Sequence, residues 1–352
     1  MSHSEHWPPL SQCYFKSLRL RVLSLGEAMR RRDFILLVGG SAVAWPLAAR
    51  PQQLRSPRIG VLHPFSTPDP WAAGLRRGLR DLGYVEGRTI TIDERGSEEH
   101  DERLDGLAKE LIDNKVDVLV TITGPAFFAA TRHTKTLPIV MAISGDGVGV
   151  PGVASLARPG GNVTGTTMMN PDLDGLRLSI LKEAVPSAKR IAVIYNPNEP
   201  ASVNELRKTE GAAKMLGIDL QSVEAPSAES LDQAFQNALA GGAGAFFTFA
   251  HAFAFSNRAR ISELAAKYHL PGMYGWPEFA EAGGLMVYGP NIADILYRAA
   301  SFVDRIIKGE NPAEMPIEQP TRLELVINLK TAKALGLEIP AALLVRANKV
   351  IE

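Results

Sequence analysis

Two stretches of the chain repeat the same pattern of apolar and polar positions. Residues 58–68 read RIGVLHPFSTP and residues 190–200 read RIAVIYNPNEP, so each begins with arginine, continues as an aliphatic run and ends in proline and polar residues. A short continuous apolar run before a turn signal and a helical pattern is typical of a buried parallel strand that leads into a helix. The repeat therefore predicts two α/β lobes of similar build. A cleft between two lobes is a common place for a small-molecule site.

Strands and helices continue to alternate after each copy. In the first lobe, apolar runs predict strands at residues 58–64, 89–94, 116–122 and 138–143, with helices at 71–82, 104–111 and 127–131. In the second lobe, the predicted strands are 190–195, 220–223, 245–250, 272–274 and 283–290, and the predicted helices include 173–184, 203–216, 231–239 and 261–268. Right-handed crossovers fold each series into one parallel sheet. The fold class we expect is therefore α/β, with two Rossmann-like lobes.

Three segments are expected to join the lobes as a hinge. They are the threonine-rich residues 164–167, the glycine-containing residues 282–284 and the proline-rich residues 316–321. A helix at 295–308, a strand at 323–327 and a last helix at 328–335 lie around the final crossings. The expected N-terminal lobe is residues 50–164 with 284–318, and the expected C-terminal lobe is residues 165–283 with 319–352.

Candidate site residues follow from the position of the strand ends. In parallel α/β sheets, ligands bind beyond the carboxyl ends of the strands. In the first lobe these ends hold Phe65, Ser66, Thr123, Gly124, Ser144 and Asp146. In the second lobe they hold Asn196, Asn198, His251, Phe253 and Tyr274. Most of these side chains are neutral hydroxyls, amides or aromatic rings, which suit binding better than acid–base chemistry.

Three of these residues have a second interpretation. Thr123 and Gly124 precede a predicted helix, whose N-terminus favours a carboxylate, but a threonine here also suits a simple helix cap. His251 has no serine–aspartate or metal partner that the pattern can assign, and a lone histidine at a strand end is more often a packing or hydrogen-bonding residue. We therefore expect no catalytic residue, no metal and no cofactor.

Composition and charge narrow the class of protein further. The 352 residues suffice for two domains, and 38 basic residues balance 38 acidic ones, so the chain lacks the basic excess typical of nucleic-acid binding. The single cysteine, Cys13, rules out intrachain disulfides and zinc–thiolate sites. Beyond the N-terminal region, no apolar stretch reaches the roughly 18–20 residues of a membrane span, so we expect a body that is not inserted in the membrane.

The N-terminal region has the pattern of an export signal. Arg31 and Arg32 belong to a positive segment that Phe34 follows closely. Residues 34–49 carry no charge and end in small residues. This pattern resembles a twin-arginine signal at residues 29–49, with cleavage after Ala49, and it predicts a periplasmic protein. A buried helix or membrane anchor is the alternative. Residues 1–28 show no clear pattern and are interpreted as an unstructured upstream extension.

Several longer motifs carry a family resemblance. They are LGYVEGR at residues 82–88, LARPGGNVTG at 156–165, GGLMVYGP at 283–290 and EQPT at 318–321. With the signal, these motifs resemble the periplasmic substrate-binding proteins of ABC transporters, type I fold, in the branch related to tryptophan and tyrosine uptake.

The resemblance implies a monomeric receptor whose lobes close on a small ligand and pass it to a permease and an ATPase at the inner membrane. In related amino-acid receptors the third and fourth strand ends of the N-terminal lobe hold the ligand's carboxylate and amine. The corresponding residues here are Thr123 with Gly124, and Ser144 with Asp146. Two other classes stay open, a periplasmic sensor subunit of a signalling system and an exported α/β enzyme.

Overall fold

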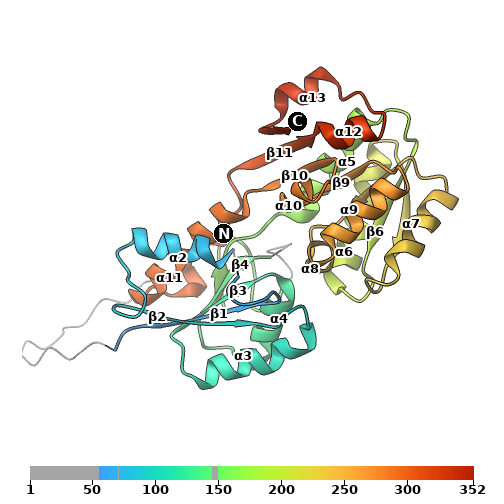
Figure 1. Cartoon of the computed structure of the whole chain (residues 1–352). Helices are drawn as coiled ribbons and strands as arrows, with labels where there is room; N and C mark the ends of the chain where they lie inside the picture. The colour runs from blue at the N-terminus through green and yellow to red at the C-terminus, as the bar shows by residue number, and fades with distance from the viewer. Residues whose placement is uncertain (1–54, 70, 145–149) are drawn as a thin grey trace, which may run out of the picture. The chain divides into compact units, whose positions relative to one another are not determined.

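The strands of the described residues form two β-sheets (Figure 1). The structure is a computed structural model that describes residues 55–69, 71–144 and 150–352. The first sheet has the strand order β2-β1-β3-β4-β5 with parallel pairing throughout. The second has the order β12-β11-β10-β9-β8-β6-β7, and β10 and β11 pair antiparallel within it. The expected two-lobed α/β fold is confirmed.

The first lobe begins with a series of alternating strands and helices. They are β1 (Arg58–His63), α2 (Ala72–Asp81), β2 (Thr91–Gly96), the 3₁₀ turn η1 (Asp101–Arg103), α3 (Leu104–Asp113), β3 (Val118–Ile122), α4 (Gly124–His133), β4 (Ile139–Ile143) and β5 (Val163–Gly165). Every residue of β3 and β4 is buried. Burial on both faces explains why these strands read as continuous apolar runs rather than as an alternating pattern.

The second lobe repeats this plan. It begins with α5 (Asn170–Ala184), β6 (Arg190–Tyr195), α6 (Pro200–Met215), β7 (Asp219–Glu224), α7 (Leu231–Ala240), β8 (Ala245–Thr248), α8 (Ala252–Ser256), α9 (Arg258–Lys267), β9 (Gly272–Tyr274), α10 (Glu278–Glu281) and β10 (Met286–Pro290). The opening strands β1 and β6 share one burial pattern, a half-buried arginine followed by five buried residues. The sequence repeat therefore reports a repeated structural unit.

The C-terminal part of the chain returns to the first lobe and then completes the second. Its elements are α11 (Ile292–Ile307), the 3₁₀ turn η2 (Pro312–Glu314), β11 (Leu323–Asn328), α12 (Leu329–Ala334), α13 (Ala341–Arg346) and β12 (Lys349–Ile351). Helix α11 packs closely on α2. The helices are so close that a Cβ at Gly78 would lie 2.5 Å from the Tyr297 carbonyl oxygen. Tyr84 also donates a hydrogen bond of 2.9 Å to Asp304 of α11.

The sheet pairing places one expected lobe boundary differently. Strand β10 pairs with β9 and β11 in the second sheet, whereas the sequence assigned residues 284–318 to the first lobe. The chain therefore leaves the second lobe after Pro290 rather than near residue 284. An apolar strand pattern does not show which sheet the strand will join, because that choice depends on partners distant in the sequence.

Two of the crossing segments lie side by side. Glu318 donates its N–H to the Gly165 carbonyl oxygen at 2.8 Å and accepts from the Thr167 N–H at 3.0 Å. Gly165 has φ +130°, and a Cβ there would overlap the carbonyl oxygen of Met141, so this crossing requires glycine.

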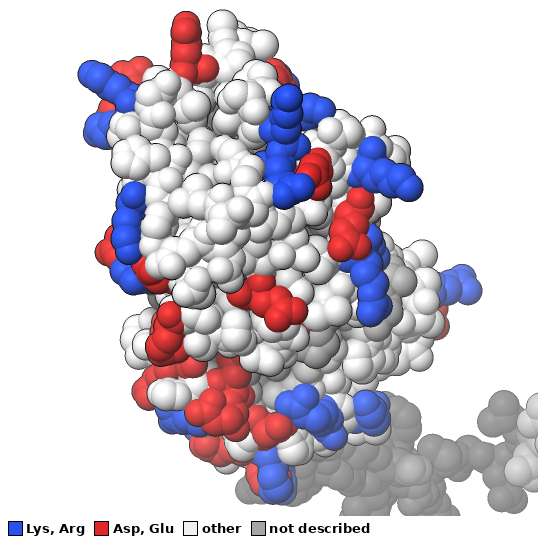
Figure 2. Space-filling view, turned by 90° about the vertical axis from the view of Figure 1, so that its right-hand side faces the viewer, with Lys and Arg blue, Asp and Glu red and all other residues white. Residues whose placement is uncertain are grey.

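Figure 2 shows a face on which basic and acidic side chains are interspersed. Among the helices of the described ranges, none combines the length and hydropathy that a membrane span requires. Arg31, Arg32, Phe34, the expected cleavage site after Ala49, and Asp146 lie outside the described residues.

Candidate ligand-binding site

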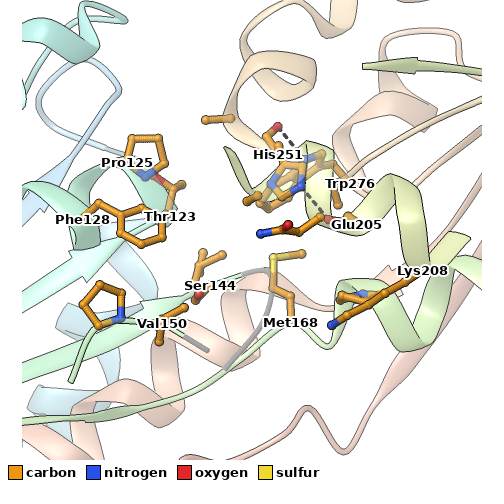
Figure 3. A pocket seen from close by; sticks show the side chains of 18 residues that line it. Thr123, Pro125, Phe128, Ser144, Val150, Met168, Glu205, Lys208, His251 and Trp276 are labelled. Carbon is orange, nitrogen blue, oxygen red and sulfur yellow. Dashed lines mark hydrogen bonds and ion pairs between the residues drawn. The ribbon is translucent and has the colours of Figure 1, made fainter. Parts of the chain in front are cut away.

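A cavity of about 370 Å³ is lined by residues from both lobes (Figure 3). This volume lies within the roughly 300–1,000 Å³ of typical small-molecule sites. The first lobe contributes the residues after β3 and β4, and the second lobe contributes one face of α6 and the residues after β8. The cavity therefore lies where the strand-end rule predicts a ligand.

The first wall is formed around the N-terminus of α4. Thr123 follows β3, is 4% exposed and adopts a left-handed backbone with φ +81°, which is uncommon for a β-branched residue. Its hydroxyl oxygen is buried and has no hydrogen-bond partner among the described residues. Gly124 and Pro125 begin the ten-residue helix beside it and also line the cavity. A helix N-terminus and a spare hydroxyl together suit an anionic group.

The rest of the first wall combines a polar position with apolar surface. Ser144 follows β4, lines the cavity, and accepts a hydrogen bond of 2.7 Å at its carbonyl oxygen from the Met168 N–H. Phe128, Met168 and Val150 add apolar surface. The wall can therefore hold a carboxylate beside an apolar group.

The second wall includes residues that the strand-end rule did not predict. Ala201, Asn204, Glu205 and Lys208 line the cavity from α6, at the i, i+3, i+4 and i+7 spacing of one helical face. This spacing is the signal that could have identified them. Trp276 adds a buried indole to the same wall.

His251 lies on the second wall, opposite Thr123 in Figure 3. Its Nε2 lies 2.6 Å from Oε2 of Glu205, and its carbonyl oxygen accepts a hydrogen bond of 3.3 Å from the Trp276 indole. Burial favours the neutral imidazole, but the Glu205 carboxylate outweighs it and raises the pKa of His251 to about 8. At neutral pH the ring is therefore mainly an imidazolium.

Further buried charged residues lie near His251 and Glu205. Asp174 and Arg177 of α5 form a fully buried ion pair at 2.8 Å, and Arg177 also donates to the Tyr288 carbonyl oxygen at 2.8 Å. Burial, with the nearby Glu205 charge, raises the pKa of Asp174 well above its ordinary value despite Arg177. Burial also acts to raise the pKa of Glu205, but His251 outweighs it and the pKa is lowered. These opposite directions favour the ionised form of Glu205, next to His251, more than that of Asp174.

An aromatic cluster joins the lobes beside the cavity. Trp71 of the first lobe has ring centroids at 4.3 Å from Phe255 and 5.1 Å from Trp276, and its indole N–H donates to Oε1 of Glu278 at 2.8 Å. Phe65 packs edge-on against Trp71 at 5.0 Å. Phe65 was expected in the site, and the structure places it in this cluster rather than in the cavity wall.

The structure brings together some of the expected site residues and not others. Thr123, Gly124, Ser144 and His251 line the cavity. Six described candidates do not line it: Phe65, Ser66, Asn196, Asn198, Phe253 and Tyr274.

Each of these six has local surroundings that account for its position. Ser66 is exposed. The backbone N–H of Asn198 donates to the side-chain oxygen of Asn196, and the Asn198 side-chain amide donates to the Pro226 carbonyl oxygen. The Phe253 N–H is bonded to Glu199, and the fully buried Tyr274 ring stacks on Phe279 at 4.2 Å. The strand-end rule gives the correct edge of the sheet, but it does not show which way each loop side chain turns.

Comparison with known proteins decides the family. A family model described as ABC transporter substrate binding protein matches residues 58–351. The chain belongs to this family. A tyrosine-binding protein of Clostridioides difficile (strain R20291) is 26% identical over 266 residues, covering 75% of this chain and 76% of the relative.

Two solved structures extend the comparison. One is the ABC domain in complex with L-Trp from Streptococcus pneumonia, with a TM-score of 0.79. The other is a conserved domain protein from Vibrio cholerae O1 biovar eltor, with a TM-score of 0.78. Each is 27% identical, and each match covers 84% of this chain and 100% of the other. The family resemblance predicted from the sequence motifs is confirmed, and the protein is the substrate-binding component of an ABC transporter.

Proposed function

We propose that this protein is the receptor of an importer for an amino acid with an aromatic side chain. The ligand's carboxylate is bound at the N-terminus of α4, by the hydroxyl of Thr123 and the first free N–H groups of the helix. The observation that carries this placement is the buried hydroxyl of Thr123, which has no hydrogen-bond partner among the described residues although Thr123 lines the cavity. An unpaired buried hydroxyl is costly, and a ligand oxygen would remove that cost.

The apolar part of the ligand packs against the aromatic and aliphatic walls. Trp276, Phe128 and Met168 provide such surface on different sides of the cavity. The tyrosine-binding relative and the structure in complex with L-Trp support an aromatic ligand, because both are similar to this chain over most of its length.

The receptor acts without catalysis and moves as it binds. Its lobes close about the three crossing segments, and the closed form is recognised by a permease and an ATPase at the inner membrane. Residues 29–49 act as a twin-arginine signal that exports the chain to the periplasm, where it functions as a monomer. The signal pattern of Arg31, Arg32 and Phe34 supports the export route.

A thermal-shift screen tests the proposed ligand. The chain from residue 50 onward is heated with each L-amino acid and with a set of aromatic carboxylates. A true ligand at 100 times its Kd adds about 2.7 kcal/mol to the free energy of unfolding, so L-tyrosine or L-tryptophan should raise the melting temperature clearly.

Two outcomes would argue against the proposal. Stabilisation by sugars or polyamines, with no effect of any amino acid, would reject the ligand class. Turnover of an added substrate that disappears in His251→Ala would reject a purely binding role. Small-angle scattering of the identified complex should also show a smaller radius of gyration than the free protein.

A further inference from the structure

The second wall of the cavity contains His251, whose imidazole is surrounded by buried titratable groups. His251 is the cavity-lining end of a buried series of titratable groups that runs through Glu205 and Asp174 to Arg177. The side chain of Glu205 is 3% exposed and that of His251 is 13% exposed, so the contact between them is shielded from water. Charges are rarely buried in a lobe unless they are paired or used.

The geometry fixes what the imidazole can offer to a ligand. Nε2 donates to Glu205 at 2.6 Å, which leaves Nδ1 as the second donor of the charged ring. Asn170 anchors the adjacent backbone, since its side-chain amide donates to the Ala250 carbonyl oxygen at 3.0 Å. These contacts hold the ring in one orientation. A group that contacts a ligand directly needs such a fixed orientation.

We propose that the ligand's carboxylate bridges the two lobes, with Thr123 and the α4 N-terminus on one side and the imidazolium of His251 on the other, and that Glu205 is the positioning residue that keeps His251 charged. This inference rests on the proposed function. It identifies the anionic end of the ligand as the group that both lobes share. In the closed form, the fixed positive charge of the second lobe then meets a carboxylate that is also bound to the first lobe.

The charges that face His251 from each side agree with this role. From α6 come Glu205, its hydrogen-bond partner, and Lys208, which lines the same cavity. Glu199, just before α6, acts on the ring in the same sense as Glu205, whereas Arg177 of α5 opposes it. Since burial also opposes the charged ring, removal of Glu205 should leave His251 neutral at pH 7.

The first experiment measures the titration of His251 by nuclear magnetic resonance in the ligand-free chain from residue 50 onward. The wild-type ring should titrate near pH 8, and in Glu205→Gln it should titrate below 6.5. A wild-type ring that titrates at or below 6.5 overturns the proposal, whatever ligand the protein binds.

The second experiment measures affinity by calorimetry between pH 6 and pH 9, with L-tryptophan and indole-3-propionate as probes. If binding requires the charged ring, the wild-type Kd should rise about tenfold between pH 7 and pH 9, by proton linkage. Glu205→Gln should already be about tenfold weaker at pH 7, and His251→Gln should be weak at every pH. Indole-3-propionate has no ammonium group, so its profile excludes titration of the probe's own amine.

A matched control separates positioning from general damage. Glu224→Gln removes another carboxylate of the second lobe, one that accepts from the Tyr195 hydroxyl at 3.2 Å and does not line the cavity. It should keep the wild-type pH profile. Comparison of unfolding curves identifies any variant that fails to fold, and the wild-type pH profile tests the proposal without a variant.

The outcomes distinguish this inference from the proposed function. If neither probe nor L-tyrosine binds the wild-type protein, the proposed function fails and the inference fails with it. If a probe binds with a Kd that does not change from pH 6 to pH 9, or if Glu205→Gln keeps the wild-type profile, the proposed function stands and the role of Glu205 is wrong.

Discussion

The contact of Trp71 with the second lobe allows a prediction about closure. Trp71 does not itself line the cavity, so its replacement changes affinity through the relation between the lobes and through Trp276, the cavity-lining ring that it contacts. It stacks on Trp276, packs at a tilt against Phe255 of the second lobe, and donates to Glu278. We expect Trp71→Ala to favour the open form.

The structure sets the size of this effect. Two aromatic pairs across the lobes contribute about 0.5–1.5 kcal/mol each, and the indole hydrogen bond contributes about 0.5–1.5 kcal/mol. Their loss should therefore cost the closed form about 1.5–4.5 kcal/mol, or more than tenfold in the closing equilibrium. Trp71→Phe keeps a ring and loses the hydrogen bond, so it should cost the closed form less.

Calorimetry and small-angle scattering with L-tryptophan measure the two consequences. Trp71→Ala should bind at least tenfold more weakly than the wild type and should keep a larger radius of gyration at subsaturating ligand. Tyr297→Ala is the control, because this half-exposed ring packs against Arg77 within the first lobe. Wild-type affinity and radius in Trp71→Ala would refute the view that this cluster stabilises closure.

Three further predictions concern single positions. Thr123→Val should weaken ligand binding about tenfold or more in calorimetry, since a neutral donor to a charged group contributes about 1.5–3 kcal/mol, whereas Thr123→Ser should retain affinity. His251 has a folded-state pKa of about 8 against an ordinary 6.5, so its protonation contributes up to about 2 kcal/mol of stability below pH 6.5, which is lost as the pH rises through 8. Urea unfolding from pH 6 to pH 9 should show this loss in the wild type and not in His251→Gln. Gly165→Ala should destabilise the protein by about 2 kcal/mol or more in urea, because its left-handed backbone and the Met141 oxygen exclude a Cβ, whereas Gly106→Ala, with open space in a helix, should be neutral or stabilising.

The fold was predictable because parallel strands leave a strong local signal. The strands β3 and β4 are buried on both faces, so their sequences are uninterrupted apolar runs, and the polar residues that end them mark the edge where ligands bind. The same rule located Thr123, Ser144 and His251 at the cavity. Local sequence was sufficient wherever the chemistry follows directly from a strand end.

The missed residues depend on tertiary structure. Glu205 and Lys208 lie on a helix whose exposed faces also carry charges. Their spacing groups them on one helical face, but only the tertiary structure shows that this face is turned toward the cavity rather than toward water. Trp71 precedes a helix and contacts residues about two hundred positions away along the chain, including Glu278 and the ring of Trp276. Strand β10 could have completed either sheet.

The buried charges of the second lobe show how binding and packing are connected. A buried ion pair such as Asp174 with Arg177 adds little net stability, because desolvation offsets the attraction. The lobe nevertheless makes room for it: a Cβ at Gly275 would lie 2.8 Å from the Arg177 guanidinium, and Gly289 faces the same group at 3.5 Å. The pair links α5 to the end of β10 and leads through Glu205 to the cavity. Stability alone therefore does not account for this arrangement. Under the proposal above, Glu205 is the member that serves binding, because it favours the charged ring of His251, whereas Arg177 acts against that charge.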